Sequence, residues 1–182
     1  MRPWYPILVG AVALQRVREL ALSRRQEAAR PGPRAASGSY PLMVAAHTAL
    51  MVLPPLEARW RGRRPQRPGL WVGLLVAATG LRWWSIRALG AQWNVRAAVS
   101  PDLVPVTVGP YRWIRHPNYL AVVLEFAALP MAGGAWMSAI GLSALDGVVL
   151  WDRIRAEESL LERASGYVEA FAGKARFIPG IF

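Results

Sequence analysis

Residues able to do chemistry gather in two short segments in the second half of the chain. The first segment, residues 108–119 with the sequence VGPYRWIRHPNY, places Arg115 and His116 immediately before Pro117. Proline favours the first position of a helix, so we expect a helix to begin there and to direct its free N–H groups towards those two side chains. A site of this kind can hold an anionic ligand. A belt of Arg, Tyr and Trp at a membrane interface has a similar composition, so both interpretations stay open.

The second segment, residues 152–158 with the sequence DRIRAEE, follows the last long apolar stretch. Arg153 lies four positions before Glu157, and Arg155 lies three before Glu158, so each pair shares one surface of a helix. A solvated helix end carrying salt bridges has the same pattern. If the two apolar segments between the clusters form a helical hairpin, however, the clusters meet on one side of the molecule and can bind a polar ligand together.

The segments that must position these clusters are strongly apolar. The chain has 182 residues, of which 54% are hydrophobic, and it contains no Cys. The longest uncharged run would span roughly 30 Å as a helix, which is about the thickness of the hydrocarbon core of a bilayer. Uncharged runs cover residues 3–15, 40–56, 69–81 and 126–145. Four such runs are too many for the core of a soluble protein of this size. We therefore predict an all-α, polytopic helical membrane protein and exclude intrinsic disorder and a disulfide scaffold.

Breaks in the apolar pattern divide the chain into five predicted membrane helices. Pro130 and the glycine pair that follows it split the last apolar region into a hairpin. The helices are expected at residues 3–22, 40–58, 69–89, 118–130 and 135–162, and the second half of the first is expected to emerge at the membrane surface. The chain is interpreted as one domain, residues 1–182, with three helices in 1–89 and a catalytic half in 90–182. We expect the last hairpin and the C-terminal tail to form a cofactor pocket.

The distribution of basic residues predicts an orientation. The formal net charge is +11, from 22 basic and 11 acidic residues. With five spans, six basic residues fall on the side of the N-terminus, and the others fall on the side of residues 90–117 and the tail. By the positive-inside rule the second side is cytoplasmic, and the Arg-rich, Ala-rich composition points to a bacterial inner membrane. Because the arginines are scattered over helix ends and form no single stripe, binding to nucleic acid is not expected.

Two ionisable residues lie inside predicted membrane helices. Glu125, about two turns into the fourth helix, is interpreted as a buried strut, a neutral acid or a part of the site, and these alternatives stay open. His47 is expected to be a packing residue with one hydrogen bond. With only two His and no Cys in the chain, we expect no metal site.

Taken together, the two chemical clusters resemble those of a known family. The GPYRWIRHPNY segment at residues 109–119 is followed by an apolar hairpin and then by Arg153, Glu157 and Glu158. This order resembles the isoprenylcysteine carboxyl methyltransferase family of integral membrane methyltransferases. The ending RFIP at residues 176–179 also fits, and RVRELALSRR at residues 16–25 is similar to the opening of the family's small bacterial branch.

The resemblance implies a fold, a cofactor and a substrate class. It implies a five-span helical core that S-adenosylmethionine enters from the cytoplasm and leaves as S-adenosylhomocysteine. It also implies a lipophilic acceptor that enters from the bilayer. Apart from this small substrate and membrane lipids, no partner is expected, and neither nucleic acid nor metal takes part.

The resemblance also assigns roles to individual residues. It implies cofactor binding by Val108, Gly109, Tyr111, His116, Pro117, Tyr119, Glu157 and Glu158. It implies catalytic roles for Arg153, His116 and Glu157. A carboxylate acceptor would need no base and would be oriented by Arg153, with Arg115 and Arg96 as the other candidates. A phenol or an enol would have to give up a proton, to His116 or to a Glu.

The acceptor itself is left open by the resemblance. A carboxyl or hydroxyl oxygen is expected to receive the methyl group, on an isoprenylcysteine-like carboxylate or on a lipid-like polyketide. Asn118 and Ala121 stand where the eukaryotic enzymes typically carry Ser and Gly, which favours the alkylpyrones and alkylresorcinols associated with the bacterial branch. A phospholipid N-methyltransferase, a nicotinamide-dependent membrane reductase related to sterol reductases, and a non-catalytic scaffold are the alternatives.

Overall fold

The computed structural model describes residues 2–30, 32–33, 38–62, 64–97, 99, 103–163 and 166–177 of the chain. Five long helices make up most of this part: α1 (Trp4–Ala29), α2 (Tyr40–Arg61), α3 (Pro68–Leu89), α4 (Pro117–Gly133) and α5 (Trp136–Leu161). Three short helical turns accompany the loops: η1 (Gly90–Gln92), η2 (Gly109–Arg112) and α6 (Tyr167–Ala170). No strand occurs in the described residues, so the all-α prediction is confirmed.

Each predicted helix is present, and three of the helices end later than predicted. The second was expected to end at residue 58, whereas α2 continues to Arg61. The first helix was expected to end near residue 22, whereas α1 continues to Ala29, because Glu19 and Ser23 on its second half are buried against other elements. The fourth helix passes through Pro130 and ends at Gly133. Gly134 caps it with a left-handed φ of 79°, so the glycine and not the proline ends the helix.

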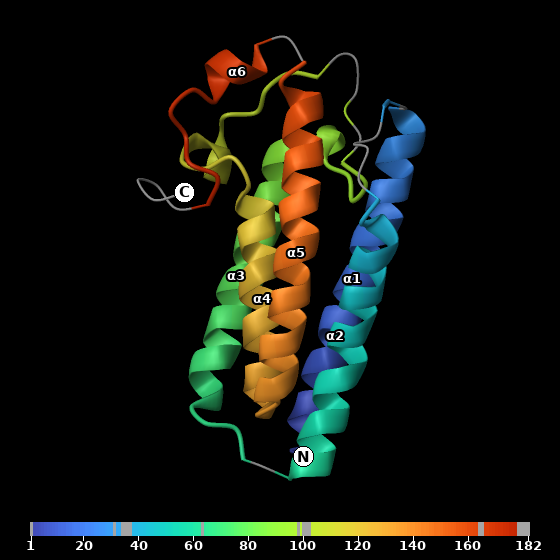
Figure 1. Cartoon of the computed structure of the whole chain (residues 1–182), viewed down its shortest axis with the longest axis vertical. Coiled ribbons are helices and arrows are strands. Elements are labelled where there is room, and N and C mark those ends of the chain that lie inside the picture. Colours follow the sequence, from blue (N-terminus) through green and yellow to red (C-terminus); the bar gives the residue numbers. More distant parts are fainter. Residues whose placement is uncertain are drawn as a thin grey trace.

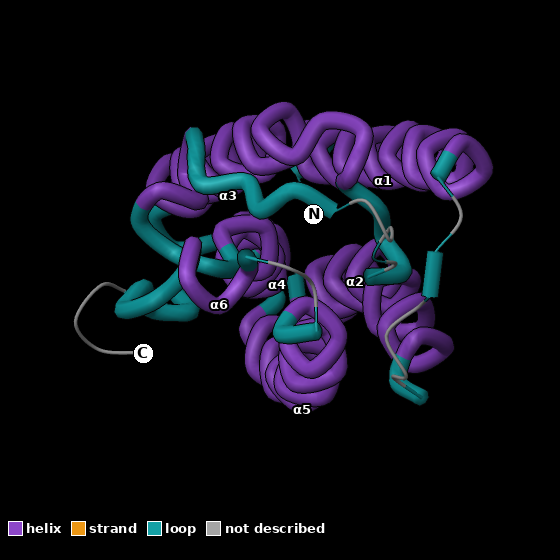
Figure 2. The backbone as a smooth tube through the Cα atoms, turned by 90° about the horizontal axis from the view of Figure 1, so that it is seen from above, coloured by secondary structure: helices purple, strands orange, loops and turns teal. Residues whose placement is uncertain are grey.

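The helices run up and down the bundle (Figure 1). The N-terminus and the α2–α3 connection lie at one end, and α6, the long α3–α4 loop and the C-terminal tail lie at the other. Seen from above, α4 lies between α3 and α5, the two helices with which it packs most extensively (Figure 2). The start of α4 and the end of α5 therefore meet at the end that carries the loops.

Apolar side chains lie both inside and outside the bundle. Leu50, Phe126 and Leu129 are fully buried in its core. Ile7 and Val148, on α1 and α5, are well exposed to the surroundings. Apolar residues on the inner and the outer faces of the same helices are typical of a membrane environment.

Two helices in the described part of the chain are long and apolar enough to cross a membrane, at Tyr40–Arg61 and Pro68–Gln92. The 17 residues of α4 fall short in length. The helices α1 and α5 carry more charged residues within their apolar stretches. The finding supports a membrane protein, whereas the count of five spans and the orientation stay predictions.

A glutamate on α2 fixes the start of α5. The backbone N–H groups of Met137 and Ser138 donate to the carboxylate oxygens of Glu57 at 3.1 and 2.7 Å. The Ser138 hydroxyl donates to the same carboxylate at 2.7 Å. A negative charge at a helix N-terminus is favourable, so this contact positions the hairpin from the end remote from the loops.

A close approach of α1 to the end of α4 depends on a glycine. The Tyr5 hydroxyl donates to the Leu129 carbonyl at 3.0 Å, and the Tyr5 ring lies against Gly133. A Cβ atom on Gly133 would stand 2.2 Å from Tyr5 Cζ. The missing side chain is therefore what allows the two helices to come together here.

We expect Gly133→Ala to destabilise the folded protein by about 1–3 kcal/mol, because the new methyl group overlaps a buried ring. The measurement is thermal unfolding of the purified protein in detergent. Gly141→Ala on α5 is the matched control, since no atom of the described residues lies within 4 Å of its Cβ position. Alanine is the better helix former, so the control should be neutral or slightly stabilising. Equal melting temperatures for the two variants would contradict this packing.

Candidate active site

One large cavity lies at the end of the bundle that carries the loops and the tail. Its volume is about 660 Å³, which is within the range of small-molecule sites. Its walls come from α1, α2, α3, the start of α4 and the end of α5, together with parts of the loop after η1 and α6. The predicted pocket of the last hairpin and the tail is therefore incomplete, because α1 and α2 supply walls as well.

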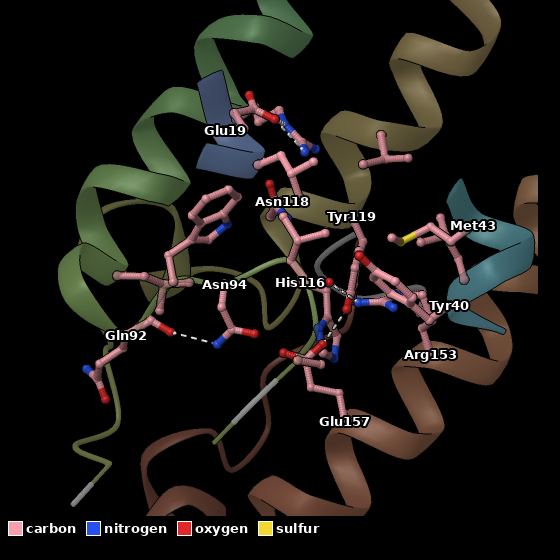
Figure 3. A pocket seen from close by; sticks show the side chains of 18 of the residues that line it. Glu19, Tyr40, Met43, Gln92, Asn94, His116, Asn118, Tyr119, Arg153 and Glu157 are labelled. Carbon is pink, nitrogen blue, oxygen red and sulfur yellow. Dashed lines mark hydrogen bonds and ion pairs between the residues drawn. The ribbon is translucent and has the colours of Figure 1, made fainter. Parts of the chain in front are cut away.

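The structure brings five of the nine predicted site residues to this cavity: Tyr111, His116, Tyr119, Arg153 and Glu157. Figure 3 shows the last four of these gathered in one part of the cavity. The other four are absent from the described residues that line it: Val108, Gly109, Pro117 and Glu158. The geometry thus separates side chains that can touch a ligand from side chains that can only support them.

The paired acids turn in different directions. Glu157 and Glu158 are consecutive on α5, so they point about 100° apart around the helix. Glu157 turns into the cavity, where the Tyr119 hydroxyl donates to its Oε2. Glu158 turns towards the tail, where His116 Nε2 lies 3.1 Å from its Oε1 and Arg176 Nη2 donates to its Oε2 at 2.6 Å. One acid therefore faces the cavity, and the other holds His116 in place.

The C-terminal tail fixes the segment before α4. Ile114 and Ala175 form a parallel bridge. The backbone N–H groups of Arg115 and His116 donate to the carbonyls of Ala175 and Arg176 at 2.9 and 3.0 Å. The position of His116 thus depends on residues near the end of the chain. The last two residues of the family-like RFIP ending lie outside the described residues.

Arg153 is held firmly at the cavity wall. Its Nη2 donates to the Val95 carbonyl at 2.7 Å, and only 4% of the residue is exposed. Its Nε has no hydrogen-bond partner in the part of the chain that the structure describes. A buried, unpaired guanidinium N–H can donate to a ligand oxygen. Of the two other arginines considered, Arg115 lines the cavity and Arg96 stacks over Tyr40.

Two of the predicted site residues that do not line the cavity are explained by the backbone around them, which requires a glycine at one position and favours a proline at the other. Gly109 has a φ of 60°, and a Cβ there would lie 3.1 Å from Trp84 Nε1. Glycine therefore allows η2 to pack on α3. Pro117 is fully buried at the first position of α4, as predicted. Val108 is largely exposed.

Sequence reasoning missed a group of charged side chains deeper in the bundle. Arg16 Nη2 donates to both oxygens of Glu125, at 2.9 and 2.8 Å. Arg82 Nε donates to Glu19 at 2.9 Å, and Arg16 also bonds Glu19. Glu125, for which three interpretations were open, is therefore an ion-paired strut between α1 and α4. The sequence does show four ionisable residues within apolar helices, and this could have indicated the cluster. Which of them pair with one another cannot be predicted from the sequence, because the pairing depends on how α1 packs.

His47 behaves as predicted. Its Nδ1 lies 2.9 Å from the Met43 carbonyl, and its ring packs edge-on against Phe126 with 5.0 Å between ring centroids. His47 also lines the cavity, which the sequence did not indicate.

Charges around the tail stabilise the ionised form of Glu158, which lies in the last turn of α5. Burial of this carboxyl would raise its pKa, but hydrogen bonds from His116 and Arg176 outweigh burial and lower the pKa to about 2. Burial, followed by the nearby charge of Glu157, raises the pKa values of the Tyr111 and Tyr167 hydroxyls. These two hydroxyls therefore stay protonated and can donate hydrogen bonds at neutral pH.

The helical fold and its apolar helices fit a membrane protein, and one end of its bundle carries a cavity of the size of small-molecule sites. The profile of the isoprenylcysteine carboxyl methyltransferase (ICMT) family matches residues 71–163, more than half of the chain, and the chain belongs to that family. Its members are membrane-integral methyltransferases that use S-adenosylmethionine, so the resemblance found in the sequence is confirmed.

A similar relative is the "Uncharacterized protein YpbQ" of Bacillus subtilis (strain 168). The two chains are 29% identical over 165 residues, which cover 87% of this chain and 97% of the relative. The comparisons give no support to the N-methyltransferase and reductase alternatives.

The Glu158 cluster predicts how stability depends on pH. A carboxyl whose pKa is lowered by folding stabilises the folded state fully above its ordinary value of 4.5, and this contribution is lost as the pH falls towards about 2. We expect Glu158→Gln to be less stable than the wild type at neutral pH and to lose less on acidification over that interval. Thermal unfolding at a series of pH values measures this. The exposed Glu162→Gln is the control, and a wild-type acid dependence in Glu158→Gln would contradict the assignment.

Proposed function

We propose that this chain transfers the methyl group of S-adenosylmethionine to a carboxyl or hydroxyl oxygen of a lipophilic acceptor, in a bacterial inner membrane and with its cavity facing the cytoplasm. One observation carries the proposal: a single cavity extends from the Tyr119–Glu157 pair to apolar side chains of α1 and α2. A polar cofactor and an apolar acceptor can therefore occupy it together. Membership of a methyltransferase family supports the same class of reaction.

The polar part of the cavity fits S-adenosylmethionine, which supplies an electrophilic methyl group on a sulfonium. Glu157 uses Oε2 for Tyr119, so its Oε1 can accept from an ammonium or a ribose hydroxyl. The buried indole N–H of Trp93 has no partner among the described residues and can donate to a ligand. The Tyr111 ring can hold a cation against its face, and Arg115 can bind a carboxylate.

The apolar part of the cavity fits a lipophilic acceptor. Its walls include Val44, Met51 and Val52 on α2, Val122 on α4 and Leu150 on α5. Burying an apolar chain against such walls contributes about 25 cal/mol per Å². Val44 and Val52 line the cavity and are half-exposed, so we expect the acceptor to enter along this side of α2.

In this arrangement the protein aligns the reactants and excludes water. Methyl transfer is an in-line displacement, so the acceptor oxygen must lie on the line through the methyl carbon and the sulfur. The unpaired Nε of Arg153 can orient that oxygen. A carboxylate acceptor needs no base, whereas a hydroxyl acceptor gives its proton to Glu157 or to His116, of which only Nε2 contacts Glu158.

Calorimetric titration of S-adenosylmethionine and S-adenosylhomocysteine into the purified protein tests the proposal. We expect both compounds to bind with micromolar affinity. Glu157→Gln removes a charge-assisted contact, and His116→Ala removes the ring stacked on Tyr119, so each should weaken binding at least about tenfold. Glu162→Gln, one turn beyond Glu158 and exposed, should bind as the wild type does.

Failure of both compounds to bind folded protein would overturn the proposal. Binding of a reduced nicotinamide cofactor in their place would indicate a reductase instead.

A further inference from the structure

Four charged side chains form a network in the apolar part of the bundle, which we call the Arg16 cluster: Arg16, Glu19, Arg82 and Glu125. Arg16 binds both oxygens of Glu125 through Nη2 and binds Glu19 through Nη1. Arg82 binds Glu19 through Nε, and its Nη2 lies 2.9 Å from the same carboxylate. The cluster joins α1, α3 and α4, and its formal charges cancel.

Holding three helices together does not by itself account for this cluster. Ionisable groups inside membrane helices are costly, and they typically mark a path or a site for a ligand. A well-packed apolar pair can often replace a buried ion pair without loss of stability. A cluster that only tied helices together would also be expected to use all of its N–H groups.

The Arg16 cluster instead contains N–H groups without a partner among the described residues, on side chains that line the cavity. Arg16, Glu19 and Arg82 all line it. Arg16 Nε and Arg82 Nη1 are buried and have no hydrogen-bond partner within the described ranges. Only 6% of Arg82 is exposed, so bulk water has little access to it. Two such guanidinium N–H groups are complementary to an oxygen atom of a bound molecule.

The cluster is separate from the residues expected to hold the cofactor. In Figure 3, Glu19 lies on the far side of the cavity from Glu157. Helix α1 also lies outside residues 71–163, so the family match assigns no role to Arg16 or Glu19. The same side of the cavity is bordered by the apolar residues of α1 and α2, including Val17 and Val44.

We propose that Arg16, together with Arg82, binds an oxygen of the acceptor head group, and that Glu19 and Glu125 hold Arg16 in position to do so. Arg16 is then a specificity-determining residue on a helix outside the family match. This inference rests on the proposed methyl transfer and adds the chemistry of the acceptor.

The chemistry of the cluster selects among head groups. Two guanidinium groups favour a carboxylate, an enolate or a carbonyl oxygen beside the oxygen that is methylated. An ammonium offers hydrogen-bond donors and no acceptor, so an amine head group cannot pair with these N–H groups. A phenol without a neighbouring carbonyl leaves one donor unpaired and should bind less tightly.

The test uses the double variant Arg16→Met/Glu125→Met, which removes both partners of the Arg16–Glu125 pair together. The variant also loses the contact of Arg16 with Glu19, and Glu19 keeps its pair with Arg82. The matched control is Tyr5→Phe, which removes a buried hydrogen bond at the far end of the bundle. Each protein, in lipid nanodiscs, is first titrated with S-adenosylhomocysteine. The loaded proteins are then titrated with acetylated farnesylcysteine, a long-chain alkyl hydroxypyrone and a long-chain alkylresorcinol.

We expect the wild type to bind the carboxylate or the hydroxypyrone probe more tightly than the alkylresorcinol. The double variant should bind the preferred probe at least about tenfold more weakly, with unchanged affinity for S-adenosylhomocysteine. Tyr5→Phe should match the wild type in both titrations.

Three outcomes would overturn the role of Arg16. In the first, the double variant binds the probes as tightly as the wild type does. In the second, the double variant loses affinity for S-adenosylhomocysteine in parallel with the probe. In the third, the loaded wild-type protein binds none of the probes. Failure of the wild type to bind S-adenosylhomocysteine would instead overturn the proposed methyl transfer, and the acceptor site with it.

Discussion

The site depends on two hydrogen bonds that cross from the start of α4 to the end of α5. Tyr119 binds Glu157, and His116 binds Glu158. His116 and Tyr119 are three positions apart and so share one face at the start of α4, whereas the two acids diverge around α5. This geometry directs Glu157 into the cavity and turns Glu158 to the tail. Without the hairpin between the two helices, neither bond could form.

The hairpin in turn depends on contacts at the opposite end of the bundle. The Glu57 carboxylate caps the start of α5, and Gly133 allows Tyr5 to close against the end of α4. Small residues and satisfied backbone groups are what helix packing in a membrane requires. A site at one end is therefore aligned by packing at the other.

The sequence was informative wherever the pattern is local. The start of α4 at Pro117 and the meeting of the two chemical clusters follow from a proline signal, two glycines and an apolar hairpin. The pairing of Arg16 with Glu125 could not be predicted, because it joins residues 109 positions apart and depends on how α1 packs. Nor could the sequence predict which of Glu157 and Glu158 faces the cavity, since this depends on the rotation of α5 and on the position of Arg176.

The cavity combines a part that the family match covers with a part that it does not. Glu157, Arg153 and Tyr119 lie within residues 71–163, and the apolar walls of α1 and α2 lie outside them. This division is what would be expected if the cofactor chemistry is common to the family and the choice of acceptor belongs to each branch. If the proposed role of Arg16 holds, the charged residues of α1 extend the site towards the acceptor.

The most direct test is transfer of a radiolabelled methyl group from S-adenosylmethionine to a lipophilic acceptor by the wild-type protein in nanodiscs. Labelled product is extracted into organic solvent after incubation with farnesylcysteine, hydroxypyrone or resorcinol acceptors. We expect label in an ester or an ether of at least one acceptor, with release by alkali distinguishing the ester. Label in none of them, or only in the amines of lipid head groups, would contradict oxygen methylation by this cavity.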